Sequence, residues 1–358
     1  RRGDYRNKGP QVSPRPLGVV LASQKRDAFE PDWIVPASAT TGRRAALARW
    51  LTGPENPLTP WVIVNRLWQY HFTRGIVATS SDLGVRGEPP SHPELLDWLA
   101  AELISVGWRF KPIHRLIVNS ATYRQSSKPI PKLAEQDSDN TLLGRMNRRR
   151  LDAEGVRDAM LAVSGELNPK MGGPGVLAPL EKEVEDLIFT EAEVVDLWPE
   201  DRDPSEHLRR SLYLYRKRNV RYPLLESFDS PDNQSPCPRR ETSTHALQAL
   251  NLLNSDFAFG RARALAGGIL REAGPGQDER IGRAYQVVLC RQPSPSELDR
   301  ARKFLASQAE MIRGQAKAVR TPSKPTGLID RPLDPAEGAA WVDFALAMLN
   351  CNEFLYVP

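Results

Sequence analysis

The chain has 358 residues, 40% of them hydrophobic and 26% charged, with a net charge of +5 and a pI near 9.1. That balance is typical of an ordinary globular protein, and the length is enough for one large domain or about two smaller ones. No apolar run approaches the roughly 18 residues of a membrane span. The three cysteines have neither metal-ligand spacing nor a CxxCH motif, which excludes a structural zinc or a covalent haem on this segment.

Residues 1–40 carry several prolines among polar residues and show no helical periodicity. We expect them to form an extended N-terminal arm, or a linker from a missing upstream domain. The chain also begins without methionine, so we expect it to be a fragment or a processed product.

Helices are predicted in quick succession after the arm, and the signals for their ends are clear. Ser91-His92-Pro93-Glu94 is a capping box that predicts a helix start, and Gly107 predicts its end. The predicted helices of this half cover residues 41–51, 59–74, 91–107, 111–125 and 151–167.

Residues 169–240 differ, because they combine glycine, proline and acidic residues without helical periodicity. Only 211–215 alternates at period two, which predicts a short strand or hairpin near 211–216. Helices return at 242–254, 255–271, 278–290, 294–312 and 334–350, two of them opened by Ser294-Pro295-Ser296-Glu297 and by Asp334. The predicted fold class is therefore mostly α, a multi-helix body over 41–358 with an N-terminal half 41–168, an irregular insert 169–240 and a C-terminal half 241–358.

Polar residues set into the apolar helices of the first half are the best candidates for a functional site. Asn65 and Arg66 lie on a helix that is apolar almost all round, so we expect them to be buried and paired, Arg66 as a structural fork in the core. His92 and His114 have the chemistry of a general base or metal ligand, although without a paired acidic motif such as HExxH they predict no metal site. The candidate polar cluster comprises Asn65, Arg66, His92, Glu94, Asp97, His114, Arg115, Tyr123 and Arg124.

Arginine supplies 38 of the 49 basic residues, an excess that fits carboxylate pairing as readily as phosphate binding. Basic residues around the predicted strand interleave with tyrosines, a pattern found both in polymer-binding surfaces and in solvated strand edges. The candidate residues for binding an anion or polymer are Arg149, Arg150, Arg210, Arg216, Lys217 and Arg218.

The predicted helix 242–254 carries a narrow polar stripe at Thr244, Gln248, Asn251 and Ser255, flanked by alanines and leucines. The stripe fits two interpretations equally well, a polar seam between packed helices or the solvent-facing side of the helix.

Ordered motifs along nearly the whole chain carry a family resemblance. They include Asn65-Arg66-x-Trp68, the run from Ser91 to Leu99, Arg149-Arg150-Leu151, Cys237-Pro238-x-Arg240 and the final block from Asn350 to Tyr356. By these motifs the chain resembles the C-terminal domain of unknown function of planctomycete cytochrome-associated proteins. The resemblance implies an exported, periplasmic or cell-envelope setting and a haem c on a missing upstream domain. It implies no activity and no catalytic residues.

Several functions are compatible with these features. The leading hypothesis is an accessory or binding domain without a cofactor in this segment, which docks the cytochrome module of the same full-length protein or an acidic polysaccharide through Arg-rich surfaces. The alternative is a polysaccharide-active enzyme with its site around Asn65, Arg66, His92 and His114, although no catalytic motif is recognisable. Nucleic-acid binding is a further alternative, which the interspersed acidic residues disfavour.

Overall fold

The computed structural model of the chain describes residues 6, 8–10, 40–54, 56–180, 184, 198–218, 220–315, 323–328 and 333–357. The arm expected over residues 1–40 lies almost entirely outside this described part. Within it the chain is mostly helical, as predicted, and it divides into two units, Arg1–Asn147 and Arg148–Pro358.

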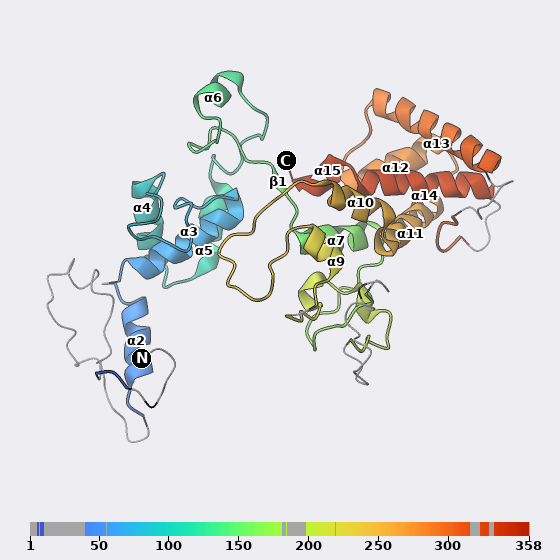
Figure 1. The fold of residues 1–358 in the computed structure, drawn as a ribbon. Coiled ribbons are helices and arrows are strands. Elements are labelled where there is room, and N and C mark those ends of the chain that lie inside the picture. Colours follow the sequence, from blue (N-terminus) through green and yellow to red (C-terminus); the bar gives the residue numbers. More distant parts are fainter. Residues whose placement is uncertain are drawn as a thin grey trace. The chain divides into compact units, whose positions relative to one another are not determined.

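Unit 1 is built around three helices, α3 (Leu58–Phe72), α4 (Pro93–Ser105) and α5 (Phe110–Asn119), which pack against one another (Figure 1). The two shorter helices of this unit are α2 (Arg43–Thr52) and α6 (Pro131–Gln136). The core of unit 1 consists of the apolar faces of the three main helices and two residues of the turn after α3. Its buried residues are Val64, Leu67, Trp68, Phe72, Ile76, Val77, Leu96, Leu99, Ala100, Leu103, Ile113 and Ile117.

The end of α4 is set by Gly107, as predicted from its position. Gly107 has a φ of 68° and donates its amide to Ile104, while the Trp108 amide donates to Leu103. These two bonds close a Schellman motif, which glycine favours because it adopts positive φ without strain. Trp108 follows with a positive φ of its own, 60°, and the chain turns directly into α5.

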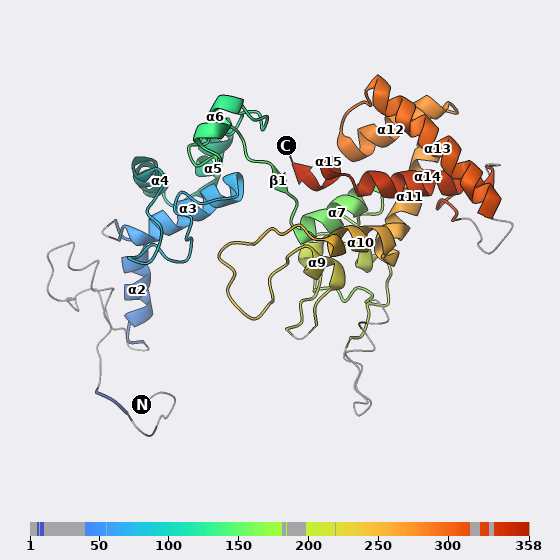
Figure 2. The same cartoon turned by 45° about the horizontal axis from the view of Figure 1, so that its top comes forward.

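Unit 2 is organised around α14 (Pro335–Leu349), which packs against the long helices α11 (Asp256–Glu272) and α13 (Pro295–Gln315). The two views of the ribbon show α14 running between them (Figures 1 and 2). The other helical elements of the unit are α7 (Ala153–Val163), η2 (Glu206–Leu208), η3 (Ser211–Tyr213), α9 (Pro223–Ser227), α10 (Ala246–Asn254), α12 (Gln277–Leu289) and α15 (Asn352–Leu355).

Strands are few in the described part of the chain. β1 (Arg149–Arg150) pairs antiparallel with β2 (Tyr356–Val357), joining the beginning of unit 2 to its end. The strand expected near 211–216 is replaced by the 3-10 helix η3 and an isolated bridge from Leu214 to Val176. Period-two alternation described this segment poorly, because its contacts come from the distant segment around 176 rather than from a neighbouring hairpin strand.

The boundary between the units differs from the division expected from sequence, which placed residues 41–168 together. Helix α7 packs on α9, α11 and η3, all of which belong to unit 2. The side chains that α7 buries, among them Val156 and Met160, belong to the same apolar core as α11 and α14. Helix spacing along the chain predicts that α7 exists, but it does not predict the core that α7 joins.

Candidate functional site

Asn65 is fully buried and braces the turn that follows α3. Its Nδ2 donates to the carbonyl oxygen of Val77 at 3.0 Å, and its Oδ1 accepts from the Val77 amide at 2.8 Å. The two bonds satisfy both backbone groups of one buried residue, as a neighbouring strand would. Gly75 lies directly over this amide, where an added Cβ would come within 2.7 Å of Asn65 Oδ1. Asn65 therefore has a structural role, because both the nitrogen and the oxygen of its side-chain amide are bonded to Val77.

Arg66 is exposed, and the expectation of a buried fork in the core was wrong. Its side chain forms no hydrogen bond or ion pair with another described residue. Its neighbours Asn65 and Leu67 are both buried, so α3 is amphipathic at this turn although its sequence is apolar almost all round. Tyr70, one turn further along, is likewise exposed, which shows that the apolar stripe of α3 is narrower than its composition indicates.

His114 and Tyr123 come together around a residue that the sequence analysis did not select, His71. The Nε2 of His71 lies 2.8 Å from the Nδ1 of His114, and a hydrogen bond joins the two rings. The Tyr123 ring packs edge-on against His71 at a centroid distance of 5.4 Å and against Phe72 at 5.9 Å. His71 stands in the last turn of α3 and had no motif around it, so only the packing of α3 on α5 could reveal it.

The remaining acidic candidates lie at the exposed start of α4. Glu94 and Asp97 are exposed, and His92 shares a hydrogen bond of 3.0 Å with Ser91. The predicted capping box is not formed there, because the Ser91 hydroxyl donates to the Ile76 carbonyl and His92 takes the N-cap position without a side-chain cap. Within the described chain, no hydrogen bond or ion pair joins one of the nine cluster residues to another.

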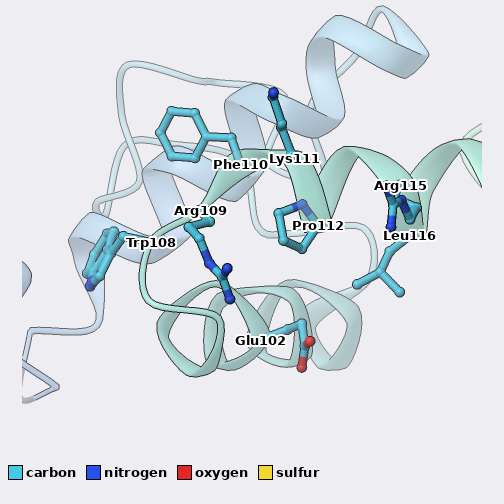
Figure 3. A pocket seen from close by; sticks show the side chains of 8 residues that line it. All are labelled: Glu102, Trp108, Arg109, Phe110, Lys111, Pro112, Arg115 and Leu116. Atoms are coloured by element: carbon cyan, nitrogen blue, oxygen red, sulfur yellow. The ribbon is translucent and has the colours of Figure 1, made fainter.

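A groove of about 640 Å³ lies between α4 and α5, on the surface of unit 1 (Figure 3). Figure 3 shows Arg109, Pro112 and Leu116 on the side of α5 that faces Glu102 of α4, while Phe110 and Lys111 project from the other side of the helix. Phe110 and Leu116 are large apolar residues left exposed. The groove is lined by Glu102, Trp108, Arg109, Phe110, Lys111, Pro112, Arg115 and Leu116.

The segment that forms this wall is strongly basic. Residues 109–128 contain five basic residues and no acidic residue. All five are exposed, and none forms an ion pair with a carboxylate in the described part of the chain. They are Arg109, Lys111, Arg115, Arg124 and Lys128. This basic segment 109–128 is therefore a surface of uncompensated positive charge beside exposed apolar side chains.

Arginines in unit 2 are used differently, mainly in internal ion pairs. Arg150 is buried, with its Nη2 2.6 Å from Asp229 Oδ2 and with further bonds to the carbonyls of Ser243 and Phe228. Burial would raise the pKa of Asp229, but hydrogen bonds from Ser243 and the charge of Arg150 outweigh it and lower the pKa. Arg150 was a candidate for polymer binding, and in the structure it connects β1 to the loop after α9.

Arg216 is committed to a second internal network, centred on Glu154 of α7. Both Arg216 and Arg240 pair with this carboxylate. Burial would raise the pKa of Glu154, but the two guanidinium groups lower it below its usual value. Through Arg216 the network connects the segment before α9 to α7, and through Arg240 it connects the segment between α9 and α10 to α7. The charge of Arg216 is therefore compensated within the unit.

The four other basic candidates of this set lie at separate points of unit 2. Arg149 is exposed on β1, and Arg210 is half-exposed with its Nε 3.7 Å from Asp158. Lys217 bridges to Val220 through its backbone, and Arg218 is exposed beside it. Two deeply buried arginines, Arg157 and Arg209, are not among the residues selected from the sequence.

The polar stripe of helix α10 faces inward. Gln248 is buried and donates to the Ser243 carbonyl, and Asn350 of the neighbouring chain end donates to the carbonyl of Leu252. The opposite face exposes Leu247, Leu250 and Leu253. Asn251 and Ser255 are half-buried, whereas Thr244 precedes the helix and is exposed. The seam interpretation therefore holds for the stripe from Gln248 onward, and the leucines lie on the solvent-facing side of α10.

Further features limit the chemistry of the described residues. Among them, no three His, Cys, Asp or Glu side chains gather in an arrangement that could hold a metal ion. Cys237, Cys290 and Cys351 are all free thiols. No described helix is both long enough and apolar enough to cross a bilayer.

Comparison with known proteins gives a family but no activity. No curated protein and no solved structure matches the chain. A family match extends over residues 43–305. This range covers the helices of unit 1 and those of unit 2 from α7 to the middle of α13. The resemblance to a domain of unknown function is thereby confirmed, and the chain belongs to the family PSD1, Protein of unknown function (DUF1553).

Proposed function

We propose that this chain is an accessory binding domain of a larger exported, cytochrome-associated protein, and that it holds an acidic polysaccharide along the basic segment 109–128. The observation that carries the proposal is the uncompensated charge of that segment. Five exposed basic side chains lie there without an acidic residue in the segment and without a carboxylate partner among the described residues.

Charge complementarity favours an acidic partner, and the geometry favours an extended one. Arg109 and Arg115 present guanidinium groups, which bind carboxylate or sulfate groups through paired N–H donors. The groove beside them is open to solvent along the surface of α5, so it admits a chain rather than enclosing a small molecule. Trp108, Phe110 and Leu116 add apolar surface on which sugar rings can pack.

The choice of polysaccharide over nucleic acid rests on setting and charge density. An exported setting, which the family resemblance implies, brings cell-envelope polysaccharide within reach. Duplex DNA carries a charge about every 1.7 Å of its axis and calls for a continuous basic stripe. In unit 2, arginines such as Arg150 and Arg216 are paired with carboxylates, which reduces the positive charge that this unit leaves free.

The enzyme alternative has less support from the contacts of its candidate residues. The side-chain amide of Asn65 is hydrogen-bonded to Val77, and the His114 ring is hydrogen-bonded to His71. Glycoside hydrolysis needs two carboxyl groups facing each other across about 5 to 10 Å, and both Glu94 and Asp97 are exposed at the start of α4. The cytochrome module of the full-length protein is the other expected partner, and no described contact favours it over the polysaccharide.

The test is binding of a carboxylated polysaccharide, polygalacturonate, measured by isothermal titration calorimetry against neutral dextran. The variant changes Arg109, Lys111 and Arg115 to glutamine. Exposed ion pairs contribute up to about 1 kcal/mol each, so the loss of three should weaken binding by about five- to 150-fold.

The matched control removes the same three charges from α13, through Arg300→Gln, Arg302→Gln and Lys303→Gln. All three side chains are exposed, so this variant should bind as the parent does. Equal weakening by both variants would show a general charge effect and reject the site. Tighter binding of a DNA oligonucleotide than of polygalacturonate would favour the nucleic-acid alternative, and release of reducing ends would favour the enzyme.

A further inference from the structure

The groove of unit 1 has a carboxylate opposite its basic wall. Glu102 of α4 lines the groove together with Arg109 and Arg115 of the basic segment 109–128. Figure 3 shows Glu102 on the α4 wall, on the side that Arg109 faces. A carboxylate in this place opposes the binding of a polymer that offers only negative charge. The groove therefore favours a partner that brings hydrogen-bond donors to Glu102 and acidic groups to the basic wall.

Glu102 is available to such a partner, because no cation in the described part of unit 1 neutralises it. Its side chain is half-buried and forms no ion pair with a described basic residue. Its Oε2 accepts one hydrogen bond of 3.3 Å from the Ser105 hydroxyl, and its Oε1 has no hydrogen-bond partner among the described residues. Ser105 thus holds one carboxylate oxygen, and the other is available to a ligand.

The place of Glu102 on α4 argues against a role in stabilising the fold. It lies in the last turn of α4, which contains no basic residue. The carbonyl groups at the end of a helix disfavour negative charge and favour cations. An unpaired carboxylate there lowers the stability of the helix, so its contribution to the molecule is better sought in the groove that it lines.

Trp108 gives the same groove an aromatic side chain at one end. Figure 3 shows it beyond Arg109, at the opposite end of the groove from Leu116. Its backbone φ of 60° is a left-handed conformation that bulky residues rarely adopt. Strained backbone of this kind is concentrated at binding and catalytic sites. The half-buried indole ring leaves part of its surface free, on which the C–H groups of a sugar ring can pack.

We infer that the groove binds a polymer of uronic acid units, in which each sugar carries both a carboxylate and free hydroxyl groups. The carboxylates pair with Arg109 and Arg115, the hydroxyl groups donate to Glu102 Oε1, and one sugar ring packs on Trp108. A charged acceptor suits the hydroxyl groups, because hydrogen bonds to ionised groups are about twice as strong as neutral ones. This inference rests on the proposed function and narrows the acidic polysaccharide to a polyuronate, with Glu102 as the residue that determines specificity.

An acidic polymer without hydroxyl groups matches the groove less well. Poly-L-glutamate offers carboxylates to the basic wall, but its side chains have no hydroxyl donor for Glu102. Its carboxylates then meet Glu102 only as like charges, which weakens binding. Glu102 should therefore strengthen the binding of a polyuronate and weaken the binding of an acidic polypeptide.

The experiment compares polygalacturonate with poly-L-glutamate, two polymers in which each unit carries a carboxylate, by isothermal titration calorimetry on the full chain. The variant is Glu102→Gln, which keeps the shape of the side chain and removes its charge. It should weaken polygalacturonate binding at least about fivefold, because the hydroxyl groups lose a charged acceptor. It should tighten poly-L-glutamate binding by about two- to fivefold, because a like charge is removed.

Glu94→Gln is the matched control on the same helix. Glu94 lies about two turns before Glu102, is exposed and does not line the groove. This variant removes the same charge from α4, so both affinities should stay within about twofold of the parent. Glu102→Gln removes an unfavourable charge from the end of α4, so its urea midpoint should not fall, and weaker binding cannot then be ascribed to unfolding.

Opposite changes for the two polymers are the expected result. Changes in the same direction, or no change for either polymer, would overturn the role of Glu102 and leave the basic segment as a binding surface. The parent chain should also bind polygalacturonate more tightly than poly-L-glutamate, and equal affinities would refute the selectivity for uronates. If the parent binds polygalacturonate no more tightly than neutral dextran, the proposed function fails and this inference fails with it.

Discussion

The Arg150–Asp229 pair offers the sharpest test of how arginine is used in unit 2. The Arg150 side chain is 3% exposed and that of Asp229 is 18% exposed, with 2.6 Å between Nη2 and Oδ2. Arg150→Ala would leave a largely buried carboxylate without its cation and the Phe228 carbonyl without this donor, while the Ser243 carbonyl keeps its bond from Gln248. Breaking a buried pair from one side costs about 3 to 5 kcal/mol. Asp229 keeps its bonds from the Ser243 amide and hydroxyl, so we expect a loss near the lower end, about 3 kcal/mol.

The control is an exposed pair of similar geometry, Arg302 with Asp278, whose side chains are 45% and 52% exposed. Arg302→Ala should leave the urea midpoint close to that of the parent, because solvent screens an exposed pair. Urea unfolding followed by circular dichroism gives both values, with hydrogen exchange in α7 to confirm that the change arises in unit 2. Equal losses in the two variants would refute the argument that burial decides the contribution of each pair.

The pH dependence of the same pair provides a second check. The pKa of Asp229 is lowered below its model-peptide value of 3.8, so the stabilisation is complete above that value and is lost as pH falls through the folded pKa. The difference between the parent and Arg150→Ala should therefore be large near neutral pH and shrink as the pH falls below 3.8. A penalty that stays constant over this range would show that the carboxylate is not the partner that matters.

Three further predictions test other parts of the structure. Hydrogen bonds from Arg291 lower the pKa of Glu297 from 4.5 to about 2, so the parent should lose stability as the pH falls between these two values. In Glu297→Gln this pH-dependent loss should be absent when unfolding by urea is measured at each pH. Asn65→Ala strands the buried amide and carbonyl of Val77 and should cost at least about 2 kcal/mol in the same assay; a change below 1 kcal/mol would contradict the bracing role. Leu247→Gln, on the exposed face of α10, should leave the urea midpoint within about 0.5 kcal/mol of the parent, and a larger loss would mean that this face is covered.

Local sequence signals determined where helices begin and end. Gly107 ends α4 because its positive φ suits the turn, and Glu297 with Ser294 caps α13 through reciprocal bonds that need only neighbouring residues. Asp334 caps α14 in the same local way. The mostly α fold class follows from such signals, since each depends on residues within one or two turns of the chain.

The capping box at Ser91 shows how tertiary contacts override a local signal. In a capping box the Ser91 hydroxyl would accept a hydrogen bond from an amide of the first helical turn. In the folded unit it donates instead to the distant Ile76 carbonyl. Similarly, the motif containing Arg149 and Arg150 predicted nothing about β1, because its partner strand lies some 200 residues away at the end of the chain. Strand pairing between residues far apart in the chain produces no pattern in the local sequence.

The candidate sites show the same difference between what local sequence predicts and what tertiary contacts decide. Sequence alone identified the block that contains Arg115, His114 and Tyr123, and the count of charges in 109–128 could be read from it directly. Only the tertiary structure decided which side chains are free: it exposed Arg66, buried Arg150 in an ion pair, turned the polar stripe of α10 inward, and placed Glu102 on the wall of the groove in unit 1. The physical reason is that burial and pairing depend on which surfaces meet, and composition along a helix does not specify the partner surface.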